Sequence, residues 1–351
     1  MKIISPFCVP AGFSRWSRRW LAVVFSLTGL ACSTARADVV GLSQTLSLTP
    51  GWNAVYLEID PSVTDPAALF AGTPVDIVAT FTPASRGQQF VRNPSAAMLS
   101  AYGWAVWYAP TRSDGFLSSL YGVYGGKAYL IHARTNASVT VTGSVGVGAT
   151  AWTPNAYNFV GFPVASPGAP TFLQFFRGSS AHNHNQIYRL VNGTWRKVLN
   201  PATEAMRAGE AFWIFCRGRS DFQGPLEVST TLRNALNLTS RAGGQVVFRN
   251  RTDHPVSFLL EHITDPARPV PLSTPVKTLD EESGAIRTVS VHFDAGHFQQ
   301  AFPPLEAGRA IRLPLALRTQ EAAPGGLYSL LKVTTDLGTI AYIPVTATRD
   351  E

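Results

Sequence analysis

The chain has little cysteine and little charge, and each shortage excludes a class of protein. Of its three cysteines, Cys8 and Cys32 lie in an amino-terminal targeting segment, so Cys216 stands alone after processing and no intramolecular disulfide is expected. Only 15% of residues are charged and 45% are hydrophobic, which excludes a disordered polyelectrolyte. The 29 glycines and 25 prolines indicate short strands joined by tight turns. This composition predicts an all-β fold.

Long apolar runs and catalytic motifs are also missing. After residue 37 no apolar run approaches the roughly 20 residues that a membrane-spanning helix needs, so we expect no span in the mature chain. There is no Gly-x-Ser-x-Gly elbow and no glycine loop that follows a strand and opens a helix. Cys216 has no histidine near it in the sequence and is interpreted as a packing residue. These gaps predict a protein that is not an enzyme and uses no cofactor.

The first 37 residues have the three parts of a signal peptide. Arg15, Arg18 and Arg19 precede an apolar run from Leu21 to Ala31, and the segment ends at Ala35-Arg36-Ala37. We expect cleavage after Ala37 and an extracytoplasmic protein, whether periplasmic, surface-bound or released.

Two other export routes remain open. Ser17-Arg18-Arg19-Trp20-Leu21 partly matches a twin-arginine signal, and Gly29-Leu30-Ala31-Cys32 loosely matches a lipidation box. On any of these routes the basic residues belong to the targeting segment. Without its five, 24 Lys and Arg remain against 22 Asp and Glu, a net charge of +2. Nucleic acid is therefore not an expected partner.

An internal repeat follows the signal peptide. Residues 48–61 and 152–164 both place apolar residues at every second position when Asn53 is aligned with Asn158, which is the period of a strand with one buried face. A second motif, Gly126 to Ile131, aligns with Gly209 to Ile214. The opening motifs are 105 residues apart and the closing motifs 83, so the first copy holds 22 extra residues.

The repeat predicts a duplicated β module. Copy 1 occupies residues 38–148 with a long inserted loop, and copy 2 occupies residues 149–231. Each copy has an aromatic strand region in its middle, Trp104 to Tyr108 and Ile187 to Trp195. Asn192-Gly193 predicts a type I′ hairpin turn, because both residue types tolerate positive φ. Short helices are expected at Asp65–Phe70, Thr171–Phe176 and Pro94–Ser100.

These motifs resemble a repeat of bacterial secreted and cell-surface proteins, in which a Pro-Gly-Trp-Asn strand precedes a Tyr/Trp hairpin and a Gly-x-Ala/Gly-aromatic-Trp-Ile strand. Copy 1 has Gly51-Trp52-Asn53 but Tyr129-Leu130 in place of the aromatic pair. Copy 2 matches best through Gly209 to Ile214 but has Ala156-Tyr157 in the opening motif. The resemblance implies an extracytoplasmic accessory or surface module, and it brings no catalytic residues.

Residues 232–351 change pattern and predict an immunoglobulin-like β-sandwich. The last strands form a hairpin around Asp336-Leu337-Gly338, like the final hairpin of bacterial immunoglobulin-like or fibronectin-like modules. The Cys-Trp-Cys landmarks of antibody domains are absent. The expected strands are Gln245–Asn250, Val256–His262, Thr288–Phe293, Ala310–Leu317, Leu327–Thr335 and Thr339–Ala347, with a weak one near Leu236.

Aromatic side chains are the candidate ligand-binding residues. Trp104, Trp107, Tyr108 and Trp195 are rigid and large enough to form a surface for a sugar or a peptide. Trp107 and Trp195 fit a core position equally well, and Trp52 is interpreted as core.

Histidines offer two weak metal motifs. His182 and His184 lie in a polar segment without a third ligand, which favours a solvated loop that binds no metal. His292, Asp294 and His297 fit a strand end that runs into a turn.

Three acids lie near the aromatic first module, namely Glu58, Asp60 and Asp76. A glycosidase needs two carboxylates set across a cleft, but Glu58 alternates with apolar positions and is expected on an exposed face. We therefore predict a non-catalytic exported binding or structural component whose partner is another surface protein or a polysaccharide. The alternative is a carbohydrate-binding or metal-dependent hydrolase accessory protein.

Overall fold

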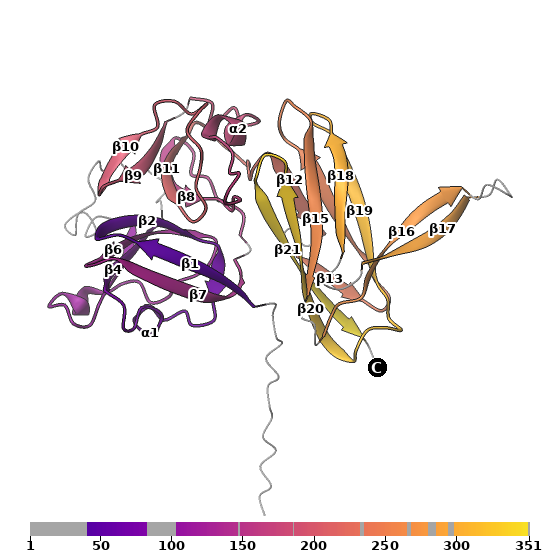
Figure 1. Ribbon diagram of the computed structural model, residues 1–351, viewed down its shortest axis with the longest axis horizontal. Coiled ribbons are helices and arrows are strands. Elements are labelled where there is room, and N and C mark those ends of the chain that lie inside the picture. Colours follow the sequence, from indigo (N-terminus) through magenta and orange to yellow (C-terminus); the bar gives the residue numbers. More distant parts are fainter. Residues whose placement is uncertain are drawn as a thin grey trace, which may run out of the picture. The chain divides into compact units, whose positions relative to one another are not determined.

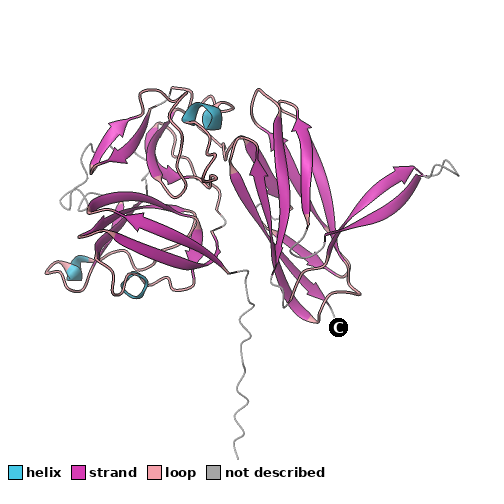
Figure 2. Cartoon of the chain, viewed as in Figure 1, coloured by secondary structure: helices cyan, strands magenta, loops and turns pink. Residues whose placement is uncertain are grey.

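The computed structural model describes residues 41–82, 103–146, 148–184, 186–231, 235–264, 268–279, 286–293 and 298–349. The signal peptide, the expected helix Pro94–Ser100, Asp294 and His297 lie outside these ranges. Strands dominate the described residues, and the helices among them are short (Figure 2). The all-β prediction is confirmed.

The first module consists of two antiparallel sheets. Leu57, Val78 and Ile131 are among the buried residues of the core in which both sheets take part. One sheet has the order β2 (Gly51–Leu57), β6 (Lys127–Ala133), β4 (Val75–Phe81), β5 (Trp104–Tyr108), and the other has the order β1 (Leu42–Leu48), β7 (Ala137–Val145), β3 (Ile59–Pro61).

The second module repeats the four-stranded sheet with the same connectivity. In both modules the strand that carries the closing motif lies between the first and second strands, which is the arrangement that a duplication predicts. Its order is β8 (Ala156–Gly161), β11 (Ala211–Cys216), β9 (Ile187–Val191), β10 (Thr194–Lys197).

The extra length of copy 1 lies in one hairpin connection. Residues 82–103 join β4 to β5, whereas Asn192-Gly193 alone join β9 to β10. Asn192 has φ 51° and Gly193 has φ 72°, which confirms the predicted type I′ turn. The strand order is the same in both sheets despite this difference in length.

Each module also has a short α-helix, at two of the expected positions. Helix α1 (Pro66–Leu69) is capped by Asp65, whose Oδ2 accepts a hydrogen bond from the Ala68 N–H at 3.0 Å. Helix α2 (Phe172–Phe176) starts at Thr171 with a capping box formed with Gln174. These caps satisfy backbone donors that such short helices leave unpaired.

The two four-stranded sheets pack against each other through one aromatic cluster. Tyr56, Leu130 and Tyr108 come from the first module, and Trp195 and Trp213 come from the second. Alternation along β5 sends Val106 and Tyr108 to this cluster and Trp107 to the core of the first module.

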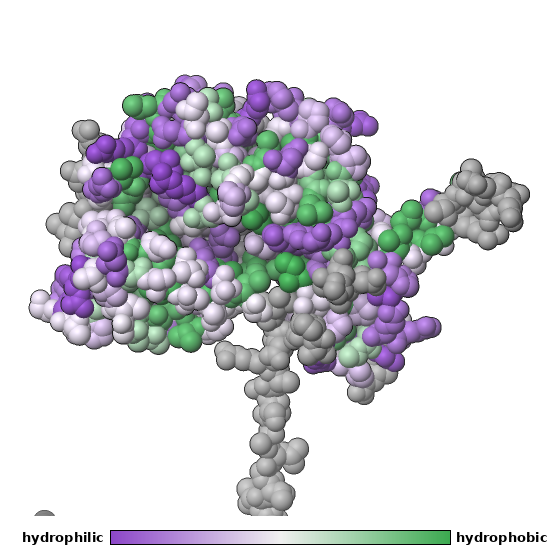
Figure 3. All heavy atoms as spheres, viewed as in Figure 1, coloured by the Kyte–Doolittle hydropathy of each residue, from purple (hydrophilic) through white to green (hydrophobic). Residues whose placement is uncertain are grey.

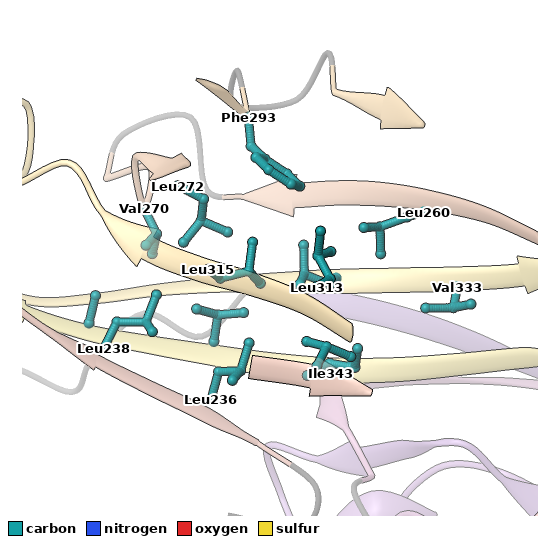
Figure 4. Close-up of a cluster of buried hydrophobic side chains, with 14 of the residues drawn as sticks. Leu236, Leu238, Leu260, Val270, Leu272, Phe293, Leu313, Leu315, Val333 and Ile343 are labelled. Carbon is teal, nitrogen blue, oxygen red and sulfur yellow. The ribbon is translucent and has the colours of Figure 1, made fainter. Parts of the chain in front are cut away.

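The C-terminal part is an immunoglobulin-like sandwich of two five-stranded sheets. Figure 4 shows its core, where Leu236, Leu260, Leu313 and Ile343 meet from both sheets. The first sheet has the order β12 (Leu226–Thr230), β14 (Gly244–Asn250), β19 (Ala310–Leu317), β16 (Leu272–Leu279), β17 (Ile286–Phe293) and the second β13 (Leu236–Thr239), β21 (Ile340–Arg349), β20 (Gly325–Thr335), β15 (Val256–Thr264), β18 (Gln299–Leu305).

Three strands of the sandwich were not expected from the sequence. Strand β12 precedes the boundary at residue 232 yet pairs with β14, so the sandwich begins earlier. Strand β16 contains Pro275, and strand β18 contains Pro303 and Pro304. Proline has no backbone N–H to donate to a ladder, so its presence in a sequence counts against predicting a strand. β18 is an edge strand, and β16 pairs with β19 only at Leu272 and Ser273, so these prolines interrupt no ladder on their outer side.

Beyond that contact, β16 and β17 continue as a two-stranded hairpin (Figure 1). Leu272 and Phe293 at its base are fully buried, whereas Val276, Val289 and Val291 further along are exposed. Figure 3 shows green apolar residues on the surface of this hairpin.

Candidate binding groove

Of the four aromatic residues expected to bind a ligand, three are buried and the fourth, Trp104, is half-buried, so they do not form a binding surface. Trp107 lies in the core of the first module, and Tyr108 and Trp195 lie between the two four-stranded sheets. Half-buried Trp104 packs against the same cluster, with its ring centroid 6.2 Å from that of Trp213. The expectation of an aromatic binding surface was wrong, because these side chains pack within the first module and between the two four-stranded sheets.

A groove of about 930 Å³ runs along strands β1 and β2. Its far walls come from residues 164–166, from Leu190, Asn192 and Gly193, from the turn 207–210, and from Ile340 and Tyr342 of strand β21. Side chains with chemical function that line it are Gln44, Trp52, Glu58, Arg207, Glu210 and Tyr342.

Gln44 fixes the floor of the groove. Its Nε2 donates to the Tyr56 carbonyl at 2.9 Å, and its Oε1 accepts the Glu58 N–H at 2.8 Å. The single side chain therefore ties β1 to the junction between β2 and β3, where Glu58 lies. The side-chain nitrogen and oxygen of Gln44 are both used in these bonds, so Gln44 positions the backbone around Glu58.

Glu58 is half-buried on the groove, contrary to the exposed position expected from its alternation with apolar residues. Burial raises the pKa of its carboxyl to about 7, so near neutral pH the group can either donate or accept a hydrogen bond. Burial also raises the pKa of Tyr342 to about 12, and the nearby Glu58 and Glu261 carboxylates act in the same direction. Tyr342 therefore remains a neutral hydroxyl.

The second carboxylate of the groove is already engaged. Glu210 receives two hydrogen bonds from the buried Arg189 guanidinium, and the Arg189 cation also lies over the Phe172 and Phe212 rings. Val55 forms an isolated β-bridge with Glu210, which fixes this residue against β2. Glu210 therefore stabilises the contact between the modules and is not a free acid for catalysis.

Trp52 is held at the edge of the groove by a partly buried polar network. The Trp52 and His132 ring centroids lie 5.0 Å apart, and His132 Nδ1 is 2.6 Å from an Asp76 oxygen. The other Asp76 oxygen accepts from Arg112 at 3.0 Å, and Arg112 also pairs with Asp114. Trp52 is half-buried, so it serves both the packing expected of it and the groove wall.

Sequence reasoning missed Gln44 and Glu58 as groove residues. One signal for Glu58 exists in the repeat, because the alignment that pairs Asn53 with Asn158 places Pro163 opposite it. A carboxyl that one copy has and the other lacks marks a property of the first copy alone. No comparable signal exists for Gln44, since β1 has no counterpart among the described strands of the second module.

The histidine motifs have different surroundings. His182 is buried against Trp152, with ring centroids 4.1 Å apart, and its Nδ1 lies 2.6 Å from Ser179 Oγ, so the expectation of a solvated loop was wrong for this residue. Exposed His184 contacts Arg217, and His292 contacts Arg318. Among the described residues, no three His, Cys, Asp or Glu side chains lie together as metal ligands would.

Two other expectations concern cysteine and the membrane. Cys216 is buried in the core of the second module, as the packing interpretation expects. Within the described residues, no helix is long and apolar enough to cross a membrane.

No family model and no curated protein matches the chain. Three solved structures share limited similarity. The Salmonella enterica SafA pilin in complex with the SafB chaperone matches with 13% identity and a TM-score of 0.24, over 36% of this chain and 54% of that one. The chain thus spans about half the length of that structure.

A PapD-like domain of human CEP192 matches with 12% identity and a TM-score of 0.21, over 36% of this chain and 86% of that one. A DUF4785 family protein of Legionella pneumophila matches with 11% identity and a TM-score of 0.19, over 88% of this chain and 89% of that one. All three TM-scores lie below 0.5.

Proposed function

We propose that the chain is a non-catalytic, extracytoplasmic binding protein that holds its ligand in the groove beside β1. The observation that carries the proposal is a groove of about 930 Å³ with a half-buried carboxyl, Glu58, positioned on its floor by Gln44. A volume in this range suits a ligand of several residues or sugar units. The partner is another surface protein or a polysaccharide.

The chemistry of the groove favours binding over hydrolysis. A glycosidase uses one acid to protonate the leaving group and a second to attack or activate water. Here Glu58 has the raised pKa of an acid, but Glu210 is neutralised by Arg189. The groove therefore offers hydrogen bonds and a partly exposed indole at Trp52, without a second free carboxylate.

A carbohydrate is the second candidate ligand. Trp52 supplies a flat apolar ring, and Glu58 and Tyr342 supply hydrogen-bonding groups on the same groove. Sugars are bound by this pairing of aromatic faces with polar side chains.

The test is a binding screen of the mature chain, residues 38–351, against a glycan array and a phage-displayed library of random peptides. Ala208 is exposed and lines the groove, so Ala208→Trp should fill it and weaken binding of any selected ligand at least tenfold. Leu199→Trp is the matched control, because Leu199 is 85% exposed and lies outside the groove. Equal binding by both variants would contradict the proposed site.

The location is tested separately. Export with cleavage after Ala37 predicts that mass spectrometry of the exported protein finds Asp38 at the amino terminus. An intact Met1, or a lipid on Cys32, would contradict that route.

A further inference from the structure

Strand β1 is an edge strand whose free side faces the groove. It pairs with β7 on one side, from Leu42 opposite Gly143 to Leu48 opposite Ala137. Residues 42–47 all line the groove. Outside the ladder with β7, no β1 backbone group has a backbone partner among the described residues. In Figure 1 β1 lies beside β7, with β2 on its other side in a different sheet.

The direction of the β1 backbone groups follows from the next strand in the sheet. The N–H groups of Ser62 and Gly146 form the bonds Ser62 N to Thr142 O, 2.9 Å, and Gly146 N to Glu58 O, 2.8 Å, so even-numbered residues of β7 direct their backbone groups toward β3. Backbone groups alternate sides along a strand, so odd-numbered β7 residues face β1.

The odd-numbered β7 residues are opposite the even-numbered residues of β1. Residues 42, 44, 46 and 48 therefore use their N–H and C=O groups in the ladder with β7. Ser43, Thr45 and Ser47 direct theirs into the groove. The result is a row of three donors and three acceptors spaced as one edge of a β-ladder, and a polypeptide backbone is the chemical group that matches it.

Strand β1 lacks the charges and prolines that protect some of the other edge strands. Edge strand β10 carries Arg196 and Lys197, and edge strand β18 carries two prolines. The seven residues of β1 are Leu-Ser-Gln-Thr-Leu-Ser-Leu, with no charge and no proline. Such an edge accepts an added strand readily.

The groove walls restrict which strand can reach β1. A second copy of the chain would present its own β1 from inside the same kind of groove, and two recessed edges cannot meet. An extended segment that enters the groove can pair along Ser43 to Ser47, about five residues at roughly 3.3 Å each. The chain already shows this kind of pairing in the groove, because Tyr56 N–H donates to the Gly209 carbonyl at 2.8 Å.

We propose that the groove binds an extended segment of another polypeptide, which adds as a strand to the free edge of β1. This inference rests on the proposed binding function and names its ligand class. Side chains of the added strand alternate between the two sides of the sheet, so every second one lies on the side of Gln44 and Glu58. Affinity then comes from the backbone of the ligand, and the Glu58 carboxyl selects a hydrogen-bonding side chain at one position.

Thr45→Pro tests the edge directly. It removes the outward N–H at residue 45 and places the proline ring in its path, but it leaves the ladder with β7 intact. Thr45→Val is the matched control, because it also loses the Thr45 hydroxyl, which lies 3.3 Å from Thr140 Oγ1, and keeps the N–H. For synthetic peptides selected from a phage-displayed library of random 12-residue peptides, Thr45→Pro should weaken binding about tenfold or more, and Thr45→Val less than threefold.

Amide hydrogen exchange on the wild-type protein is a second test, and it does not depend on whether a variant folds. Addition of the selected peptide should slow exchange at the amides of Ser43, Thr45 and Ser47, since the neighbouring amides are already protected by β7. Unchanged exchange at these three amides, or equal affinity of the two Thr45 variants, would overturn the inference.

Other outcomes separate this inference from the proposed function. If glycans but no peptides bind, and Ala208→Trp weakens them, the groove remains the site and the strand-addition inference fails. A dimer of the mature chain that Thr45→Pro dissociates would also overturn it, because the occupant would be a second copy. Loss of all binding to both libraries would contradict the proposed function as well.

Discussion

Asn53 in strand β2 of the first module and Asn158 in strand β8 of the second make the same kinds of hydrogen bonds near the start of their strands. Each Oδ1 accepts a backbone N–H, from Thr49 at 3.0 Å or Thr153 at 2.8 Å, and each Nδ2 donates to the carbonyl of that same residue. The two asparagines therefore close turns of the same kind, although the bonded residue lies four positions before Asn53 and five before Asn158. A backbone turn that a side chain must satisfy explains why this residue type occurs in both copies.

The first prediction compares these two asparagines. Asn158 is 1% exposed, so Asn158→Ala leaves buried backbone groups without partners and should lower the free energy of unfolding by about 2–4 kcal/mol. Asn53 is half-buried, so water replaces its bonds in part and Asn53→Ala should cost about 1–2 kcal/mol. Urea denaturation of both variants measures the difference. A larger cost at Asn53 would contradict this account.

The second prediction concerns Glu58. Its pKa is raised from an ordinary value near 4.5 to about 7 in the folded protein, so ionisation is less favourable in the folded chain than in the unfolded chain. The resulting destabilisation is absent below pH 4.5 and fully present above pH 7. Glu58→Gln should therefore match the wild type at pH 4 and be more stable at pH 8 by about 3 kcal/mol. A constant difference across this range would count against a buried carboxyl.

The third prediction concerns His182, which should lower the stability of the protein at acidic pH rather than at alkaline pH. Burial lowers the pKa of His182 to about 4 from an ordinary 6.5, so the unfolded chain binds the proton more strongly. Stability should fall as pH drops from 6.5 to 4, and His182→Phe should reduce that fall by about 2 kcal/mol. His262, whose pKa burial also lowers to about 4, contributes the same trend in both proteins. Denaturation of wild type and variant at pH 7 and pH 4.5 measures it, and parallel curves would contradict it.

The fourth prediction concerns the hairpin of β16 and β17. Val276 and Val289 are opposite each other and are 38% and 48% exposed, so replacing either with Thr should change stability by less than about 0.5 kcal/mol. Leu272, fully buried at the base of the hairpin, is the contrast, and Leu272→Ala should cost about 2–4 kcal/mol. Thermal or urea denaturation distinguishes the two cases. A large cost at Val276 would show that a further part of the chain covers this face.

The sequence alone was sufficient for features that depend on local backbone chemistry. The repeat could be aligned because Asn53 and Asn158, and Gly126 and Gly209, must meet the same conformational demands. The two glycines have φ 71° and 72°. The Asn192-Gly193 turn and the caps at Asp65 and Thr171 are similarly local, so residue type decides them.

Tertiary structure decided where each pattern is buried. Alternation identified the strand at Trp104 to Tyr108 but could not tell that both of its faces are covered, because the second sheet that covers one face comes from residues 156–216. Strands β16 and β18 escaped recognition because proline is unfavourable in a ladder, and only the partners of a strand show whether its outer side is free. The groove arises in the same way, because a free edge at Ser43, Thr45 and Ser47 exists only once β7 has taken the other side of β1.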